Sequence, residues 1–166
     1  DPIHTLFSVN ANYFNGFYRM KLFKHAALIT LLSFSLFATA QAMTTMAGKP
    51  VKIEQSVGKG KWTAINIWAS DCGICRQTAH HMVDIDVSLT NLDTYGVSID
   101  GVGGKAKAQQ FIRDHQLGFP NMISDLAEMD AFIYKNAKET LMGTPTMLLF
   151  SPKGKLVAVQ PGAVTA

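Results

Sequence analysis

The 166-residue sequence contains only two cysteines, Cys72 and Cys75. Without further cysteines, the chain cannot build the framework of several bridges that stabilises many small secreted domains. A zinc site would need two more ligands, and the nearest histidines, His80 and His81, do not follow Cys75 at a standard zinc-finger spacing. Three interpretations of the pair remain open at this point: a permanent bridge, half of a metal site, or a redox centre.

The chain also lacks a strong net charge and a long hydrophobic run. Residues 43–166 hold twelve Lys and Arg against eleven Asp and Glu, so this part is close to neutral and nucleic acid is not an implied partner. The most apolar stretch, residues 26–38, is shorter than the about 20 residues that a membrane-spanning helix needs. Length and composition indicate one ordinary domain with an extra segment at its front.

That extra segment has the three-part pattern of a secretory signal. Two lysines precede the apolar stretch, and small residues at Ala40 and Ala42 follow it, which predicts cleavage after Ala42. We expect residues 20–42 to be a signal peptide, residues 1–19 to be an upstream segment without an assigned function, and residues 43–166 to be one domain. The protein is expected to be periplasmic or otherwise exported, with an uncleaved membrane anchor as the alternative. In an oxidising compartment, a cysteine pair is normally a disulfide unless something reduces it.

Strand-like and helix-like segments alternate along residues 43–166, which predicts an α/β fold. Strands are expected at 51–55, 61–68, 94–99, 146–150 and 155–160. One helix is expected after Cys72, with an apolar stripe that continues to Leu89. A second is expected over 105–118, where Gly118 is placed to end it.

A third helix is expected to begin at Asp125. Asp125 and Glu128 have the spacing of a capping box, and Leu126 opens the apolar face of this helix. The Pro and Gly within residues 151–154 suit a tight connection between the last two strands, which predicts an antiparallel hairpin.

These segments and their order resemble the thioredoxin fold. The stretch INIWASDCGICR resembles the strand and active-site turn of the exported TlpA, ResA and DsbE-like thiol-disulfide oxidoreductases, and GTPTMLLFSPKGKL resembles their proline loop and hairpin. The resemblance covers about Lys49 to Gly162. It implies a thioredoxin-like three-layer fold with a central mixed sheet. The sequence stops at Ala166, where thioredoxin folds normally continue into one more helix. We therefore expect residues 43–166 to be a C-terminally truncated thioredoxin-like domain without that final helix.

The spacing of the cysteines suits thiol-disulfide exchange. At the first turn of a helix, free backbone N–H groups and the helix dipole favour the thiolate of Cys72, which is therefore expected to be the nucleophile. Cys75, one turn further along, is placed to attack the mixed disulfide and release the reduced client. A permanent bridge of this length would remove little unfolded-state entropy, which favours the redox interpretation. No cofactor is expected beyond the redox-active Cys72–Cys75 disulfide.

Further site residues come from the resemblance. It implies that Pro145 is cis and lies against the cysteine pair, and that Thr144 offers backbone groups to a docked peptide. Both are expected to contact substrate. Trp68 is assigned to the same substrate-binding surface, as a shield on one side of the disulfide, with a place in the core as the alternative.

The sequence does not name the base that deprotonates Cys75. Asn66 stands where cytosolic thioredoxins have a buried aspartate, and Thr78 stands where ResA-like members often have a glutamate. A bound water and the histidines are the alternatives. Helical spacing places His80 and His81 on a solvated face, however, which argues against them.

The predicted function is an exported reductase of protein disulfides, with protein thiol and disulfide clients and a membrane electron donor as partners. Gly73 and Ile74 bring no charge to the pair, while Asp71 disfavours a thiolate and Arg76 partly offsets it. A less stabilised thiolate makes a less oxidising pair. The alternatives are a disulfide oxidase or isomerase, and a copper-binding thioredoxin-fold module that uses the cysteines as soft ligands.

Overall fold

A computed structural model describes residues 43–164, so the predicted signal peptide and upstream segment lie outside the described residues. Six strands form one sheet in the order β1-β4-β3-β2-β5-β6. The strands are β1 (Thr44–Thr45), β2 (Trp62–Trp68), β3 (Leu92–Ser98), β4 (Asn121–Ile123), β5 (Thr146–Phe150) and β6 (Leu156–Pro161). The helices are α2 (Gly73–Ser88), α3 (Lys105–Asp114) and α4 (Leu126–Ala137), with short 3-10 helices η2 (Ile53–Gln55) and η3 (Val102–Gly104).

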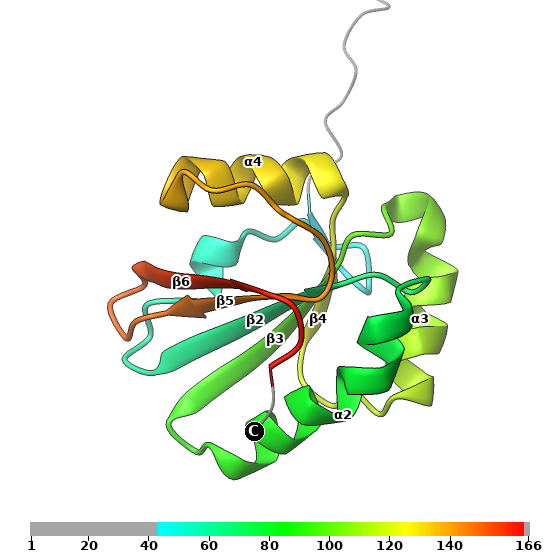
Figure 1. The fold of residues 1–166 in the computed structure, drawn as a ribbon, viewed down its shortest axis with the longest axis horizontal. Helices are drawn as coiled ribbons and strands as arrows, with labels where there is room; N and C mark the ends of the chain where they lie inside the picture. The colour runs from blue at the N-terminus through cyan, green and yellow to red at the C-terminus, as the bar shows by residue number, and fades with distance from the viewer. Residues whose placement is uncertain (1–42, 165–166) are drawn as a thin grey trace, which may run out of the picture. The chain divides into compact units, whose positions relative to one another are not determined.

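The sheet is mixed and has helices on both faces. β2, β3 and β4 are parallel neighbours, whereas β1, β5 and β6 each run antiparallel to the strand beside them. Helix α4 covers one face of the sheet, and α2 and α3 cover the other (Figure 1). The predicted three-layer thioredoxin-like fold is therefore confirmed.

The central strand β2 shows why its sequence is apolar nearly throughout. Ile65 and Ile67 point to the core under α4, and Trp68 points to the core under α2 and α3. Successive side chains of a strand face opposite sides, so a strand covered on both sides buries all of them. The two cores meet only through the sheet, and the cysteine pair belongs to the one under α2 and α3.

The front of the domain differs from the expectation. Residues 51–55 do not form a strand; Ile53–Gln55 is a 3-10 turn that buries Ile53. The strand that joins the sheet is instead β1, which pairs antiparallel with β4. Both β1 and β4 were missed, because strands of two and three residues are too short to show an alternating pattern.

The second helix ends earlier than predicted. α3 stops at Asp114, and Gln116 rather than Gly118 adopts the left-handed conformation after it, with φ of 53°. The Gln116 amide donates to the Arg113 carbonyl and the Leu117 amide to the Ile112 carbonyl, which closes the last turn. The prediction assigned the left-handed position at the helix end to Gly118, whereas Gln116, a polar residue, adopts this conformation.

The third helix, α4, has Asp125 as its N-cap, as predicted, but the Glu128 side chain does not complete the predicted capping box. The Asp125 side chain accepts the Glu128 amide at 2.8 Å, as an N-cap should. The Glu128 carboxylate accepts instead from the amide of Met43 at 3.0 Å and from the Ser124 hydroxyl at 2.5 Å. Leu126 is exposed, so it does not belong to the buried face. Leu89 is likewise exposed and caps the end of α2.

The described residues after β6 run to Val164 and contain no helix. Within residues 43–164, no helix combines the length and the apolar character needed to span a bilayer.

Candidate active site

The cysteine pair lies where β2 gives way to α2. Cys72 is the N-cap of α2, and its sulfur accepts the amide hydrogen of Cys75, with 3.0 Å between nitrogen and sulfur. The two sulfurs form a disulfide, with Cα atoms 5.2 Å apart. Both the free N–H groups at the helix start and the dipole of α2 favour negative charge on the Cys72 sulfur once the bond is reduced.

The two cysteines differ in their access to solvent. Cys72 is half-buried, whereas Cys75 is only 3% exposed and packs with Ala79, Met82 and other side chains of the core under α2 and α3. A partner molecule can therefore reach the first sulfur, and the protein itself covers the second.

The proline loop lies beside the Cys72 sulfur. β5 runs antiparallel to β2, so the start of β5 and the end of β2 meet at one edge of the sheet. The Thr144–Pro145 bond is cis, as the resemblance implies, and the Thr144 carbonyl oxygen is 3.3 Å from the Cys72 sulfur. A disulfide sulfur has no proton to donate, so this is a contact in the oxidised state. In the dithiol state the Cys72 thiol can donate to that oxygen.

The structure places Trp68 in the core. Its side chain is 1% exposed and stacks on Phe111, with ring centroids 4.4 Å apart and 18° between planes. Its indole Nε1 donates to the Asn121 side-chain oxygen at 3.3 Å. Trp68 shares the core that holds Cys75, so it supports the inner side of the pair, and its burial favours the core interpretation over contact with a docked substrate.

The residues that the sequence analysis weighed in the search for a base for Cys75 lie at different places on α2 and β2. Thr78 donates its hydroxyl to the Ile74 carbonyl within the helix, so it is occupied there. Asn66 is half-buried on the same face of the sheet as Trp68, two residues along β2. His80 is exposed and lines a pocket of about 310 Å³ together with His115, between α2 and α3.

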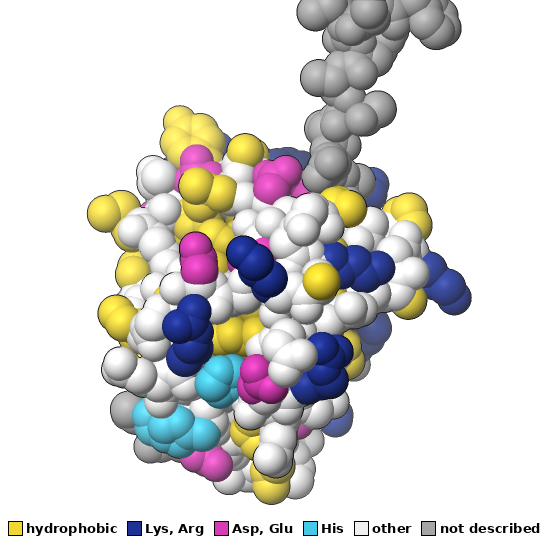
Figure 2. Space-filling model, turned by 90° about the vertical axis from the view of Figure 1, so that its right-hand side faces the viewer, with side chains coloured by type: hydrophobic (Ala, Val, Ile, Leu, Met, Phe, Trp, Pro, Cys, Tyr) yellow, Lys and Arg dark blue, Asp and Glu magenta, His cyan; other side chains and the backbone are white. Residues whose placement is uncertain are grey.

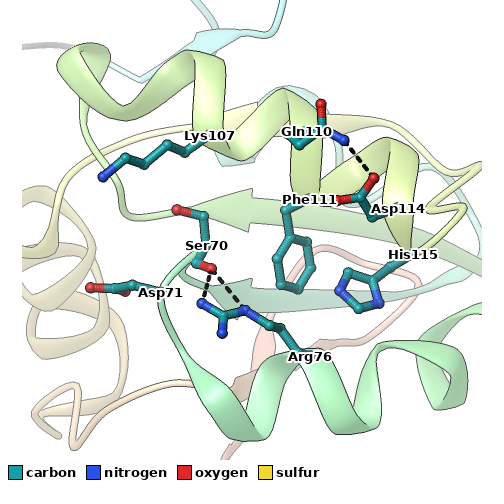
Figure 3. Close-up of a pocket in the computed structure, with 8 residues that line it drawn as sticks. All are labelled: Ser70, Asp71, Arg76, Lys107, Gln110, Phe111, Asp114 and His115. Carbon is teal, nitrogen blue, oxygen red and sulfur yellow. Dashed lines mark hydrogen bonds between the residues drawn. The ribbon is translucent and has the colours of Figure 1, made fainter.

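A second pocket, of about 380 Å³, adjoins the loop before Cys72. Phe111 forms an apolar wall of it, and the side chains of Arg76, Lys107, Asp71 and Asp114 bring charges of both signs (Figure 3). On the face of the molecule that carries α3, basic, acidic and histidine side chains are interspersed (Figure 2). The lining of this pocket is therefore mixed in charge. In the described part of the chain, no cluster of three or more His, Cys, Asp and Glu side chains is arranged to hold a metal ion.

The loop between β2 and Cys72 is held by residues that the sequence analysis did not single out for this role. The Asp100 carboxylate accepts from the backbone and hydroxyl of Ser70, and Arg76 donates to the Ser70 carbonyl (Figure 3 shows the Arg76 contact). One signal could have found Asp100: it follows the predicted strand 94–99, just as the cysteine pair follows the predicted strand 61–68. The carboxyl ends of adjacent parallel strands meet at one edge of a sheet.

Comparisons with known proteins agree with this geometry. A match to the AhpC/TSA family covers residues 34–159. The thiol-disulfide oxidoreductase ResA of Bacillus subtilis (strain 168) is 27% identical over 118 residues, which are 69% of this chain and 60% of ResA. The match thus spans less than two thirds of that relative.

Solved structures share the fold at lower identity. A thioredoxin-related protein from Neisseria meningitidis serogroup B aligns with a TM-score of 0.61 at 20% identity, covering 74% of this chain and 89% of that one. A secreted Mycobacterium tuberculosis disulfide oxidoreductase homologous to E. coli DsbE aligns with a TM-score of 0.56 at 19% identity, covering 76% and 89%. The predicted resemblance to thioredoxin-like proteins is confirmed, and the chain belongs to the AhpC/TSA family.

Proposed function

We propose that this protein is a thiol-disulfide oxidoreductase whose Cys72–Cys75 pair cycles between dithiol and disulfide. The observation that carries the proposal is the unequal placement of the two sulfurs. The Cys72 sulfur sits at the start of α2, accepts the Cys75 amide and is accessible, while Cys75 is buried behind it. This arrangement favours a thiolate where a partner can reach it. The name of the relative ResA, a thiol-disulfide oxidoreductase, supports the same activity.

In the reducing direction, exchange takes two steps. The Cys72 thiolate attacks one sulfur of a partner disulfide, and the other partner sulfur leaves as a thiolate. Cys75, after losing its proton, attacks the Cys72 sulfur; the bond to the partner breaks and the Cys72–Cys75 disulfide forms. The partner gains two electrons and the pair loses two. An external dithiol must then reduce the pair again, and we assign this step to a membrane electron donor.

We propose the reducing direction for the physiological reaction. Asp71 places a carboxylate next to Cys72, and Gly73 and Ile74 add no positive charge. A thiolate that is stabilised less makes the dithiol a better reductant. Equilibration with glutathione buffers measures the potential, which we expect well below the roughly −120 mV of a strong oxidase such as DsbA. A potential near that of DsbA would instead support the oxidase alternative.

A variant that stops after the first step tests the exchange itself. With Cys75→Ala, the mixed disulfide between Cys72 and a peptide disulfide should accumulate and appear as a mass adduct that dithiothreitol removes. Cys72→Ala is the matched control, because its remaining sulfur is buried. The proposal fails if neither variant forms an adduct, or if Cys72→Ala forms it as fast as Cys75→Ala.

We propose export from the sequence pattern of residues 20–42 alone. Expression of the full chain in a bacterial host, followed by fractionation and mass measurement, tests this. A periplasmic species that begins at Met43 is expected. Retention of the intact leader on a membrane fraction would support the anchor alternative.

A further inference from the structure

We propose that Asp100 is a positioning residue for the Cys72 sulfur and that it acts through Ser70. The inference rests on the proposed function, because it names a residue that prepares the same cysteine for exchange. Asp100 does not carry the reaction; it fixes the loop from which α2 starts.

The sheet brings the two residues together. β2 and β3 are parallel neighbours, with Trp68 opposite Ser98 at their ends. The pairing continues one residue further, since the Ile99 amide donates to the Trp68 carbonyl at 2.9 Å. Ser70 and Asp100, each two residues beyond its strand, therefore face each other.

The Asp100 carboxylate is fixed on one side and holds Ser70 on the other. Its Oδ2 accepts from the Ser98 hydroxyl at 2.5 Å, and Ser98 is fully buried. Its Oδ1 accepts from the Ser70 hydroxyl at 2.9 Å, and both oxygens lie 3.1 Å from the Ser70 amide nitrogen. Hydrogen bonds to an ionised acceptor are stronger than neutral ones, so this contact outweighs an ordinary loop hydrogen bond.

Ser70 is also held through its carbonyl group. Arg76, in the first turn of α2, donates to that oxygen from Nε at 3.3 Å and from Nη2 at 2.9 Å. Only Asp71 separates Ser70 from Cys72, and the Cys72 amide closes the turn by donating to the Ala69 carbonyl at 3.2 Å. A fixed Ser70 therefore sets where the Cys72 sulfur lies relative to the Cys75 amide.

Loss of Asp100 has two effects of opposite sign on the reduced pair. Removing a negative charge near Cys72 favours its thiolate. Releasing Ser70 lets the sulfur move away from the amide that stabilises the thiolate, which disfavours it. If Asp100 is a positioning residue, the release of Ser70 is the larger of the two effects. A substitution at Ser70 measures the effect of this release alone, because it removes no charge.

The test compares the rate at which the reduced protein is alkylated at Cys72 by iodoacetamide at pH 7. We expect Asp100→Asn to slow this reaction roughly tenfold, since small misplacements of a reacting group carry large costs in rate. Ser70→Ala should slow it about threefold, because one of the hydrogen bonds to Asp100 is lost. Ser70→Thr keeps the hydroxyl and should restore the rate. Asp93→Asn is the matched control: Asp93 lies near the other end of β3 and pairs with exposed Lys61.

Each outcome decides the inference. It is overturned if Asp100→Asn reacts as fast as the unchanged protein or faster, or if Ser70→Thr is as slow as Ser70→Ala. Urea unfolding of each variant confirms that the rates refer to folded protein. If the alkylation rates behave as expected but the unchanged protein fails to exchange disulfides with the peptide probe, the proposed function fails and the positioning role stands. If it exchanges disulfides and the variants alkylate normally, the positioning role alone fails.

Discussion

The backbone amide of Cys75 is directed at the sulfur of Cys72, 3.0 Å away. The second cysteine thus supports the first through its main chain as well as through the disulfide. Reduction breaks the sulfur–sulfur bond, and we expect this amide to stay in place because it belongs to the first turn of α2. The reduced pair is then expected to keep the Cys72 sulfur at the helix start and the Cys75 sulfur in the core.

The first prediction concerns the order of alkylation. After reduction, Cys72 should react with iodoacetamide at least about tenfold faster than Cys75, because its thiolate is favoured and it is only half-buried, while Cys75 is 3% exposed. Peptide mapping of singly alkylated protein by mass spectrometry measures the ratio. Equal modification of the two sites would contradict the placement of the sulfurs.

The second prediction concerns the carboxylate beside Cys72. Asp71→Asn removes a negative charge that disfavours the thiolate, so Cys72 should alkylate about two- to threefold faster at low salt. A favoured thiolate stabilises the reduced pair, so the variant should also be more oxidising. Because Asp71 is exposed, added salt should shrink the difference.

Asp84→Asn is the control for this effect. Asp84 is on the same helix, about 18 Å along its axis from Cys72 at 1.5 Å per residue. At that distance the direct effect of the charge on Cys72 is much weaker than that of the adjacent Asp71, and at about 0.1 M salt, where the Debye length is about 10 Å, it is largely screened. An equal acceleration by both variants would mean that net charge, not the neighbouring carboxylate, sets the reactivity.

The third prediction concerns Gly96, on β3 under Trp68. A Cβ at this position would overlap the Asn121 side-chain oxygen and lie 2.9 Å from the Trp68 indole nitrogen. Gly96→Ala should therefore break the Trp68–Asn121 hydrogen bond and lower the free energy of unfolding by about 2–4 kcal/mol. Gly103→Ala, where a Cβ meets nothing within 4 Å, should change it by less than about 0.5 kcal/mol. Urea denaturation compares the two, and similar losses would refute the overlap.

The fourth prediction concerns the cap of α4. Asp125→Ala leaves the Glu128 amide without its acceptor and should reduce the free energy of unfolding by about 1 kcal/mol. Asp125→Ser keeps a side-chain oxygen at the cap and should lose less than half of that. If serine is no better than alanine, the cap contributes little.

The elements predicted correctly are those whose burial shows as a pattern of apolar residues in the sequence, or whose ends carry a local signal. β2 is apolar on both faces because both are covered, and the Asp125 cap and the hairpin carry their own local signals. The candidate cysteines were found because their spacing is itself a signal. Short strands such as β4, and a helix end formed by Gln116, depend on contacts made elsewhere and leave no such signal.

Residues of the candidate site whose role depends on contacts with other elements were harder to predict from the sequence. From the sequence, Trp68 is assigned to the substrate-binding surface with the core as the alternative, and its 1% exposure and stacking on Phe111 of α3 favour the core. Asp100 contacts Ser98 locally, but it reaches Ser70, thirty residues away along the chain, only when β2 and β3 pair. Because this contact is non-local, its one sequence signal is that Ser70 and Asp100 each follow a predicted strand, and the pairing of these strands has to be inferred.

The hydrogen bond from Met43 to Glu128 has a consequence for maturation. Cleavage after Ala42 would turn the Met43 amide nitrogen, which lies 3.0 Å from a Glu128 oxygen, into a free ammonium group. A neutral donor would become a cation facing a half-buried carboxylate, and such charge-assisted contacts are roughly twice as strong. Removing the leader would then strengthen the contact between the start of the domain and α4.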